Sequence, residues 1–149
     1  MSGSQDALIV VGVDGSPSSI KALEWGIGQA ALTGATVEAV TAWHFPNSFG
    51  APLPDSGDYP ATAAEILDKA IATARNTCTG PGEADVTVNG YVAEGPATGI
   101  LLNRAQHARL LVVGNRGHNG LSEALLGSVS QYLVHHAHSP VVIIRDGAA

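Results

Sequence analysis

The feature that most constrains the fold is a regular alternation of short aliphatic runs with segments of helical periodicity. The runs have the length of strands buried on both faces of a parallel sheet. They span residues 7–13, 37–43, 86–92, 110–113 and 140–144. The helical segments span residues 17–34, 61–77, 96–107 and 128–136. This order predicts five mostly parallel strands, right-handed crossovers and helices on both faces of the sheet.

The size and apolar content of the chain fit one such domain. A chain of 149 residues suits a single core, which we expect to span roughly residues 7–146. Hydrophobic residues make up 45% of the chain but aromatic residues only 5%, so aliphatic side chains must fill the layers. The predicted fold class is therefore α/β, a single-domain three-layer sandwich.

Two stretches interrupt the pattern. Residues 44–60 contain four prolines and read as a long loop, which is either a mobile lid over a site or a variable surface excursion. Asn89-Gly90 is typical of a tight hairpin turn, yet it falls inside the run at residues 86–92. A hairpin there would have only short arms, so the alternation favours one strand.

Charge and targeting features exclude several classes. A formal net charge of −6 argues against binding nucleic acid or an anionic membrane through the overall field. The longest apolar run is too short to span a bilayer, and residues 1–6 lack the pattern of a secretory signal. The single cysteine, Cys78, excludes an internal disulfide and reads as a packing thiol. We therefore expect a cytoplasmic protein.

The strongest chemical signal is a glycine pattern that follows one predicted strand and precedes a predicted helix. Gly114-Asn115-Arg116-Gly117 is followed after nine residues by Gly127-Ser128. Glycines allow a close backbone approach, and the unpaired amides at a helix N-terminus attract phosphate. The Walker pattern is absent, and no dinucleotide fingerprint follows the first strand. The segment therefore predicts a phosphate site of another kind.

Taken together, four segments resemble the universal stress protein family, and the resemblance spans nearly the whole chain. They are Val11-Gly12-Val13-Asp14-Gly15-Ser16, Val113-Gly114-Asn115-Arg116-Gly117, Leu126-Gly127-Ser128-Val129 and Pro140-Val141-Val142-Ile143-Ile144. The glycine spacing is similar to that of the family's ATP-binding branch. The resemblance implies a Rossmann-like fold that binds ATP or another adenine nucleotide.

The resemblance also implies roles for individual residues. Gly114 would lie close to the ribose, with Arg116 on the same turn. Asp14 would accept a bond from a ribose hydroxyl or help to hold Mg²⁺. Val13 and Ala42 would border the adenine, with Gly12 and Val113 beside them at strand ends. The phosphates would be surrounded by Gly117, Gly127, Ser128, Val129 and Ser130.

Several of these residues have a purely structural alternative. Asp14 could cap the first turn of the helix that follows it, and Ser128 could be the N-cap of the last helix. Arg116 could be a solvated loop residue. Gly95-Pro96 could line the pocket or simply start the third helix. The histidines His135, His136 and His138 suggest a metal, but their spacing fits a surface or interface better.

These observations lead to one expected function and two alternatives. We expect a regulatory or sensor module that binds ATP, AMP or cyclic AMP, because no set of catalytic groups for phosphoryl transfer is recognisable. One alternative is a slow ATPase, with Mg²⁺ held by Asp14 and a water activated by His118 or His44. The other is a dimerisation module, since the family usually dimerises through the last strand, here Val141, Val142, Ile143 and Ile144.

Overall fold

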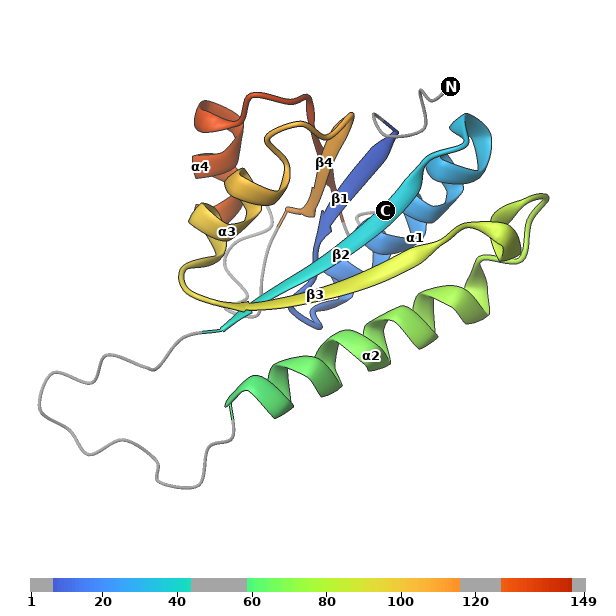
Figure 1. The fold of residues 1–149 in the computed structure, drawn as a ribbon, viewed down its shortest axis with the longest axis horizontal. Helices are drawn as coiled ribbons and strands as arrows, with labels where there is room; N and C mark the ends of the chain where they lie inside the picture. Colours follow the sequence, from blue (N-terminus) through green and yellow to red (C-terminus); the bar gives the residue numbers. More distant parts are fainter. Residues whose placement is uncertain (1–6, 44–58, 116–126, 146–149) are drawn as a thin grey trace, which may run out of the picture.

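The computed structural model describes residues 7–43, 59–115 and 127–145. Within them the chain forms one five-stranded sheet in which every neighbouring pair is parallel. The strand order is β3-β2-β1-β4-β5 (Figure 1). The strands are β1 (Leu8–Gly12), β2 (Thr36–Trp43), β3 (Val88–Glu94), β4 (Leu110–Gly114) and β5 (Val141–Ile144). The predicted parallel α/β class is confirmed.

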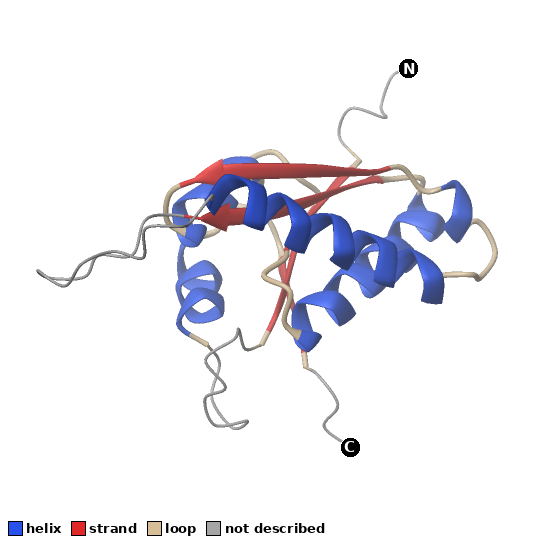
Figure 2. Ribbon diagram, turned by 90° about the horizontal axis from the view of Figure 1, so that it is seen from below, coloured by secondary structure: helices blue, strands red, loops and turns tan. Residues whose placement is uncertain are grey.

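Helices cover both faces of the sheet (Figure 2). α1 (Pro17–Thr33) and α2 (Tyr59–Thr77) pack against each other and one face, whereas α3 (Ala97–Arg104) and α4 (Ser128–His136) pack on the other. Alternate residues of β1 point to opposite faces, as strand geometry requires. Ile9 and Val11 are buried in the core under α1 and α2, and Val10 in the core under α3 and α4.

The third strand begins two residues later than predicted. A short 3-10 turn at Glu83–Asp85 precedes it, and the Arg75 guanidinium donates hydrogen bonds to the carbonyls of Glu83 and Val86. These bonds hold Val86 outside the strand. The hairpin alternative is wrong, because Asn89 and Gly90 lie within β3 and pair with β2.

The second helix begins at Tyr59, so the predicted loop ends two residues earlier than expected. Pro60 is the second residue of α2, and a proline is tolerated in the first turn because its missing N–H has no intrahelical acceptor there. Residues 44–58 lie outside the described residues, so the choice between a lid and a surface excursion stays a prediction.

The sheet order fixes where a ligand can bind. From β1 the chain moves to β2 and β3 on one side, then crosses to β4 and β5 on the other. In open α/β sheets, ligands bind at such a switch point, outside the carboxyl ends of the strands. Here those ends belong to β1 and β4, which are neighbours.

Candidate functional site

The turn between β1 and α1 satisfies its own polar groups. Asp14 Oδ1 accepts a hydrogen bond from the Ser16 amide at 2.9 Å, and the Ser19 amide donates to Ser16 Oγ. Ser19 Oγ in turn donates to the Ser16 carbonyl at 3.0 Å. Ser16 is the N-cap of α1, and Pro17 follows at the first helical position. The start of α1 is thus a closed hydrogen-bonded unit.

Hydrogen bonds hold Asn115, which follows β4, and Gly127, which precedes α4. The Gly127 amide donates to the Asn115 carbonyl at 2.7 Å, and the Asn115 amide donates to the Ile144 carbonyl at 2.8 Å. Ser130 Oγ donates to the Gly114 carbonyl at 2.6 Å. These bonds fix the first turn of α4 against the carboxyl end of β4.

The first amides of α4 are not used by the helix itself. The first intrahelical bond runs from the Gln131 amide to the Gly127 carbonyl. The amides of Ser128, Val129 and Ser130 therefore have no acceptor within the helix, and the helix dipole adds positive character to this end. The N-cap is Gly127, with no side-chain cap bond, so the prediction of Ser128 as N-cap is wrong. Ser128 is the first helical residue.

Asn115 is a buried polar residue at the end of β4 that the sequence reasoning did not single out. Its side chain is only 3% exposed, and Oδ1 has no hydrogen-bond partner among the described residues. Leaving a buried polar atom unsatisfied costs about 1–3 kcal/mol, so such atoms are rare and often functional. The motif spelled out Asn115, but only the fold reveals its burial.

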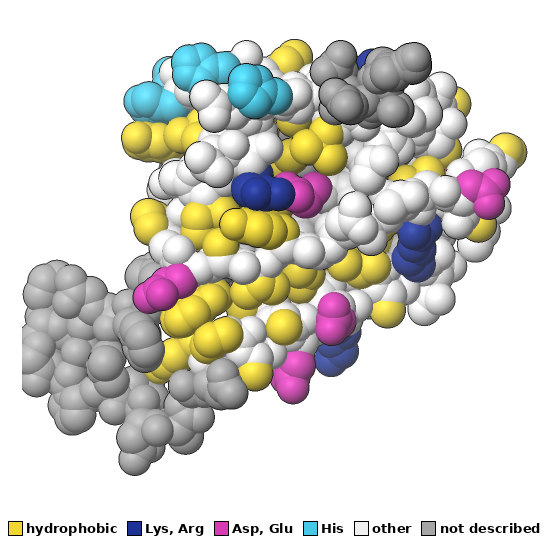
Figure 3. All heavy atoms as spheres, in the orientation of Figure 1, with side chains coloured by type: hydrophobic (Ala, Val, Ile, Leu, Met, Phe, Trp, Pro, Cys, Tyr) yellow, Lys and Arg dark blue, Asp and Glu magenta, His cyan; other side chains and the backbone are white. Residues whose placement is uncertain are grey.

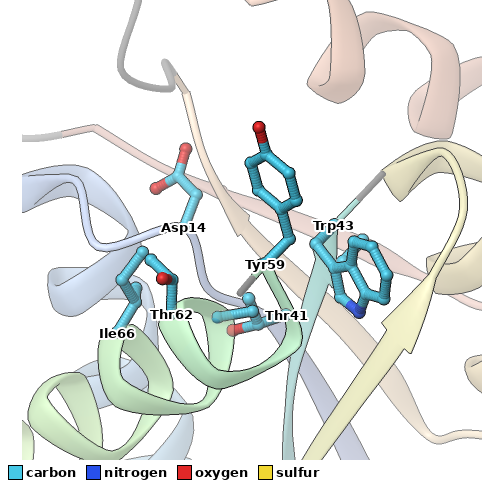
Figure 4. Close-up of a pocket in the computed structure, with 8 residues that line it drawn as sticks. Asp14, Thr41, Trp43, Tyr59, Thr62 and Ile66 are labelled. Carbon is cyan, nitrogen blue, oxygen red and sulfur yellow. The ribbon is translucent and has the colours of Figure 1, made fainter. Parts of the chain in front are cut away.

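A pocket of about 220 Å³ opens at the carboxyl ends of β1 and β2 beside the start of α2 (Figure 4). Asp14 is its charged residue. The other lining side chains are apolar, aromatic or small hydroxyl groups. They are Thr41, Ala42, Trp43, Tyr59, Thr62, Ala63 and Ile66. Thr41 Oγ1 already donates to the Val13 carbonyl at 2.9 Å.

Pocket and helix start lie at adjacent strand ends. Val11 of β1 pairs with Val112 of β4, and Asp14 and Asn115 each follow three residues later. Neighbouring strands are about 4.8 Å apart. Asp14 and Asn115 therefore follow adjacent strands, Asp14 lining the pocket and Asn115 bonded to Gly127 at the start of α4.

The predicted glycines at the strand ends have packing reasons of their own. A Cβ on Gly114 would overlap with Ser18 Oγ and would lie 2.8 Å from the Ser18 carbonyl carbon. A Cβ on Gly12 would lie 3.1 Å from a methyl group of Leu101. Val13 and Val113 are buried at 4% exposure each. Ala42, predicted to border the adenine, lines the pocket. Arg116, predicted on the turn near the ribose, and Gly117, predicted around the phosphates, lie outside the described residues.

Asp14 and Gly95-Pro96, which had structural alternatives to a site role, have defined positions in the structure. The N-cap of α1 is Ser16, and Asp14 accepts a hydrogen bond from the amide of that residue. Asp14 also lines the pocket, and its contact with a ligand stays a prediction. Pro96 is the N-cap of α3 and does not line this pocket. Gly95 has a φ of 136° and donates its amide to the Trp43 carbonyl. Gly95-Pro96 therefore starts the third helix.

Other candidate groups lie away from the site. Histidine side chains gather on the surface near α4, and among the described residues no cluster of potential metal ligands forms (Figure 3).

Burial raises the pKa of the Cys78 thiol, and Glu83 and Glu24 raise it further, which suits a packing residue. In the described ranges no helix is long and apolar enough to cross a bilayer.

A salt bridge fastens α3 to the sheet. Arg104 makes two hydrogen bonds to the Glu38 carboxylate and lies over the Tyr91 ring, 3.9 Å from its centroid. The bonds to Glu38 raise the pKa of Arg104. This cluster joins α3 to β2 and β3, so we assign it a structural role.

Comparison with known proteins now gives the family. The model of the universal stress protein family matches residues 8–145. A universal stress protein of Mycobacterium tuberculosis is 32% identical over 162 residues, covering 98% of this chain and 50% of that protein. The chain therefore spans about half the length of the curated relatives it matches.

Solved structures agree with this assignment. A crystal structure of a universal stress protein in complex with cAMP is 27% identical, with a TM-score of 0.68 and coverage of 94% of this chain and 97% of that one. A family protein from Arabidopsis thaliana with AMP bound shares the fold at 19% identity, with a TM-score of 0.60 and coverage of 95% and 93%. This chain belongs to the universal stress protein family.

Proposed function

We propose that this chain binds an adenine nucleotide, with ATP as the first candidate, across the carboxyl ends of β1, β2 and β4. The observation that carries the proposal is the start of α4. Its amides at Ser128, Val129 and Ser130 have no acceptor within the helix and are held against the end of β4 by the Gly127 and Ser130 bonds. Phosphate oxygens are the natural acceptors for such a helix start.

The surface leading away from α4 suits the rest of a nucleotide. Asp14 lies at the adjacent strand end and can accept a hydrogen bond from a ribose hydroxyl. The apolar pocket beyond it suits a base. Complexes of family members with cAMP and AMP support an adenine nucleotide as the ligand class.

The test is titration calorimetry of the protein with ATP, AMP and cyclic AMP, together with mass identification of any nucleotide that co-purifies. We expect saturable binding of at least one adenine nucleotide at one site per chain. Tripolyphosphate and adenosine, tested separately, should each bind more weakly than ATP. Absence of binding to all three nucleotides would refute the proposal.

We infer a regulatory role rather than catalysis, because the sequence carries no Walker lysine and no recognisable set of groups for phosphoryl transfer. Slow hydrolysis is the second candidate, and Asp14 beside the pocket is the observation that favours it. Mg²⁺ is usually held by one or two carboxylates together with substrate phosphates, and Asp14 fits that donor set. Product formation over hours with Mg²⁺, lost in Asp14→Ala, would support this activity, and a flat time course would exclude it.

We further propose a homodimer through β5 in the cytoplasm. β5 is an edge strand, and Val141, Val142, Ile143 and Ile144 are only partly buried in the single chain. An open apolar edge usually pairs with another strand or is covered. Light scattering should give twice the mass of one chain, whereas a monomer at micromolar concentration would contradict the dimer.

A further inference from the structure

The pocket at the end of β2 has an aromatic wall formed by Trp43 and Tyr59. Their rings are nearly parallel, with centroids 6.3 Å apart and an interplanar angle of 11°. Offset-stacked rings have this kind of separation. Trp43 ends β2, and Tyr59 begins α2, so the wall joins two elements that the sequence separates by 15 residues.

The first two turns of α2 present one face to this pocket. Tyr59, Thr62, Ala63 and Ile66 follow the spacing i, i+3, i+4 and i+7, which places them on one side of a helix. In the close-up, Tyr59 stands between Asp14 and Trp43 (Figure 4). Tyr59 is therefore placed where a flat group entering beside Asp14 would meet its ring.

Size and chemistry indicate which part of a ligand fits. Clefts that hold a drug-sized ligand measure roughly 300–1,000 Å³. The 220 Å³ pocket is smaller and suits one ring system rather than a whole nucleotide. The Thr41 hydroxyl is engaged with Val13, and Ala42, Ala63 and Ile66 offer only apolar surface.

We propose that the aromatic wall of Trp43 and Tyr59 binds the nucleotide base by stacking, with Tyr59 as the ring in contact. The inference rests on the proposed function and adds to it the residues that hold the base. The wall supplies affinity through the π-face of the base, because stacking needs no hydrogen-bond donor from the pocket.

The test compares Tyr59→Ala, Tyr59→Phe and the control Tyr132→Ala by calorimetry with ATP. Loss of base stacking costs about 1–3 kcal/mol, so Tyr59→Ala should bind ATP about 5- to 150-fold more weakly. Tyr59→Phe keeps the ring and should bind as the wild type does. Tyr132 is an exposed aromatic residue of α4 and lies outside the wall, so Tyr132→Ala should also bind normally.

A second measurement does not depend on the folding of Tyr59→Ala. The chain has two tryptophans, so Trp25→Phe leaves Trp43 as the only tryptophan. Saturable change of its emission with ATP is expected, and no change under conditions where calorimetry detects binding would overturn the inference. Unaltered ATP affinity of folded Tyr59→Ala would also overturn it. A wild-type protein that binds no nucleotide would instead refute the proposed function.

Discussion

The two helices that start beside the switch point of the sheet differ in what their first turns do with polar groups. At the start of α1, Asp14, Ser16 and Ser19 bond to one another through side chains and backbone. At the start of α4, the cap is a glycine without a side-chain bond. Asn115 beside it keeps a buried oxygen without a partner among the described residues.

Under the proposed function, this difference separates a structural helix start from the one that binds the ligand. A helix start that caps itself gains stability and has fewer donors left for a ligand. A helix start without a side-chain cap lacks that stabilisation, and its backbone N–H donors stay available for an anion. The two helix starts thus differ in the hydrogen bonds that their first residues make.

The largest effect should come from Gly114→Ala, which tests whether the two helix starts depend on each other. The new Cβ would lie 2.8 Å from the Ser18 carbonyl carbon, so the start of α1 would have to move. We expect the free energy of unfolding to fall by at least the upper end of the roughly 1–3 kcal/mol typical of overpacking. Urea denaturation measures it.

The matched control is Gly99→Ala in α3. There the nearest atom to the added Cβ is Pro96 Cγ at 4.0 Å. Alanine in place of a helical glycine should stabilise the protein by about 0.5–1 kcal/mol. Equal effects of the two substitutions would show that α1 does not press on Gly114.

The next effect concerns affinity. Ser128→Pro removes one amide donor at the first helical position, where proline is tolerated. Gly127 before it has φ −65° and ψ 162°, which suits a residue preceding proline. A hydrogen bond to a charged group contributes about 1.5–3 kcal/mol, so ATP affinity should fall about 10- to 150-fold with little loss of stability.

The control for the calorimetry of Ser128→Pro is Ser128→Ala, which keeps the backbone amide of residue 128. Ser128→Ala should bind ATP nearly as the wild type does if the backbone makes the contact. An equal loss in both variants would assign the contact to the hydroxyl and contradict the amide account.

A smaller effect is expected at the self-capped start. Ser16→Ala removes the acceptor of the Ser19 amide, and loss of an N-cap costs about 1 kcal/mol. Thermal unfolding should show this loss, while ATP affinity should change little. A large drop in affinity without loss of stability would mean that α1, and not α4, is the binding end.

The smallest effect on stability is expected for Asp14→Asn, because the asparagine oxygen can still accept the Ser16 amide. The free energy of unfolding should change by less than about 0.5 kcal/mol. The dependence of ATP affinity on Mg²⁺ should weaken if the carboxylate helps to hold the metal. If the dependence of ATP affinity on Mg²⁺ is unchanged, Asp14 contacts the ribose and does not hold the metal.

The sequence predicted what local pattern determines. The sequence of strands and helices along the chain follows from apolar periodicity and turn residues. The start of α2 was missed because proline usually marks a loop, whereas Pro60 occupies a helical turn that needs no donor. The start of β3 was missed because it depends on Arg75, a contact between distant residues.

The pocket was predicted only in part for the same reason. Asp14 and Ala42, both of which line the pocket, were predicted from the family resemblance. Tyr59 lines the pocket and stacks on Trp43. The two residues are far apart in the sequence, so no local pattern predicts this contact. The unsatisfied oxygen of Asn115 is a property of burial, and no spacing rule reports it.

The most direct test of the central claim is a ¹⁵N–¹H spectrum of the assigned protein titrated with ATP and, separately, with adenosine. We predict that ATP shifts the amide signals of Ser128, Val129 and Ser130, that adenosine leaves them in place, and that the Ser19 amide moves little with either. Unmoved signals at Ser128, Val129 and Ser130 under saturating ATP would contradict the claim that the start of α4 binds phosphate.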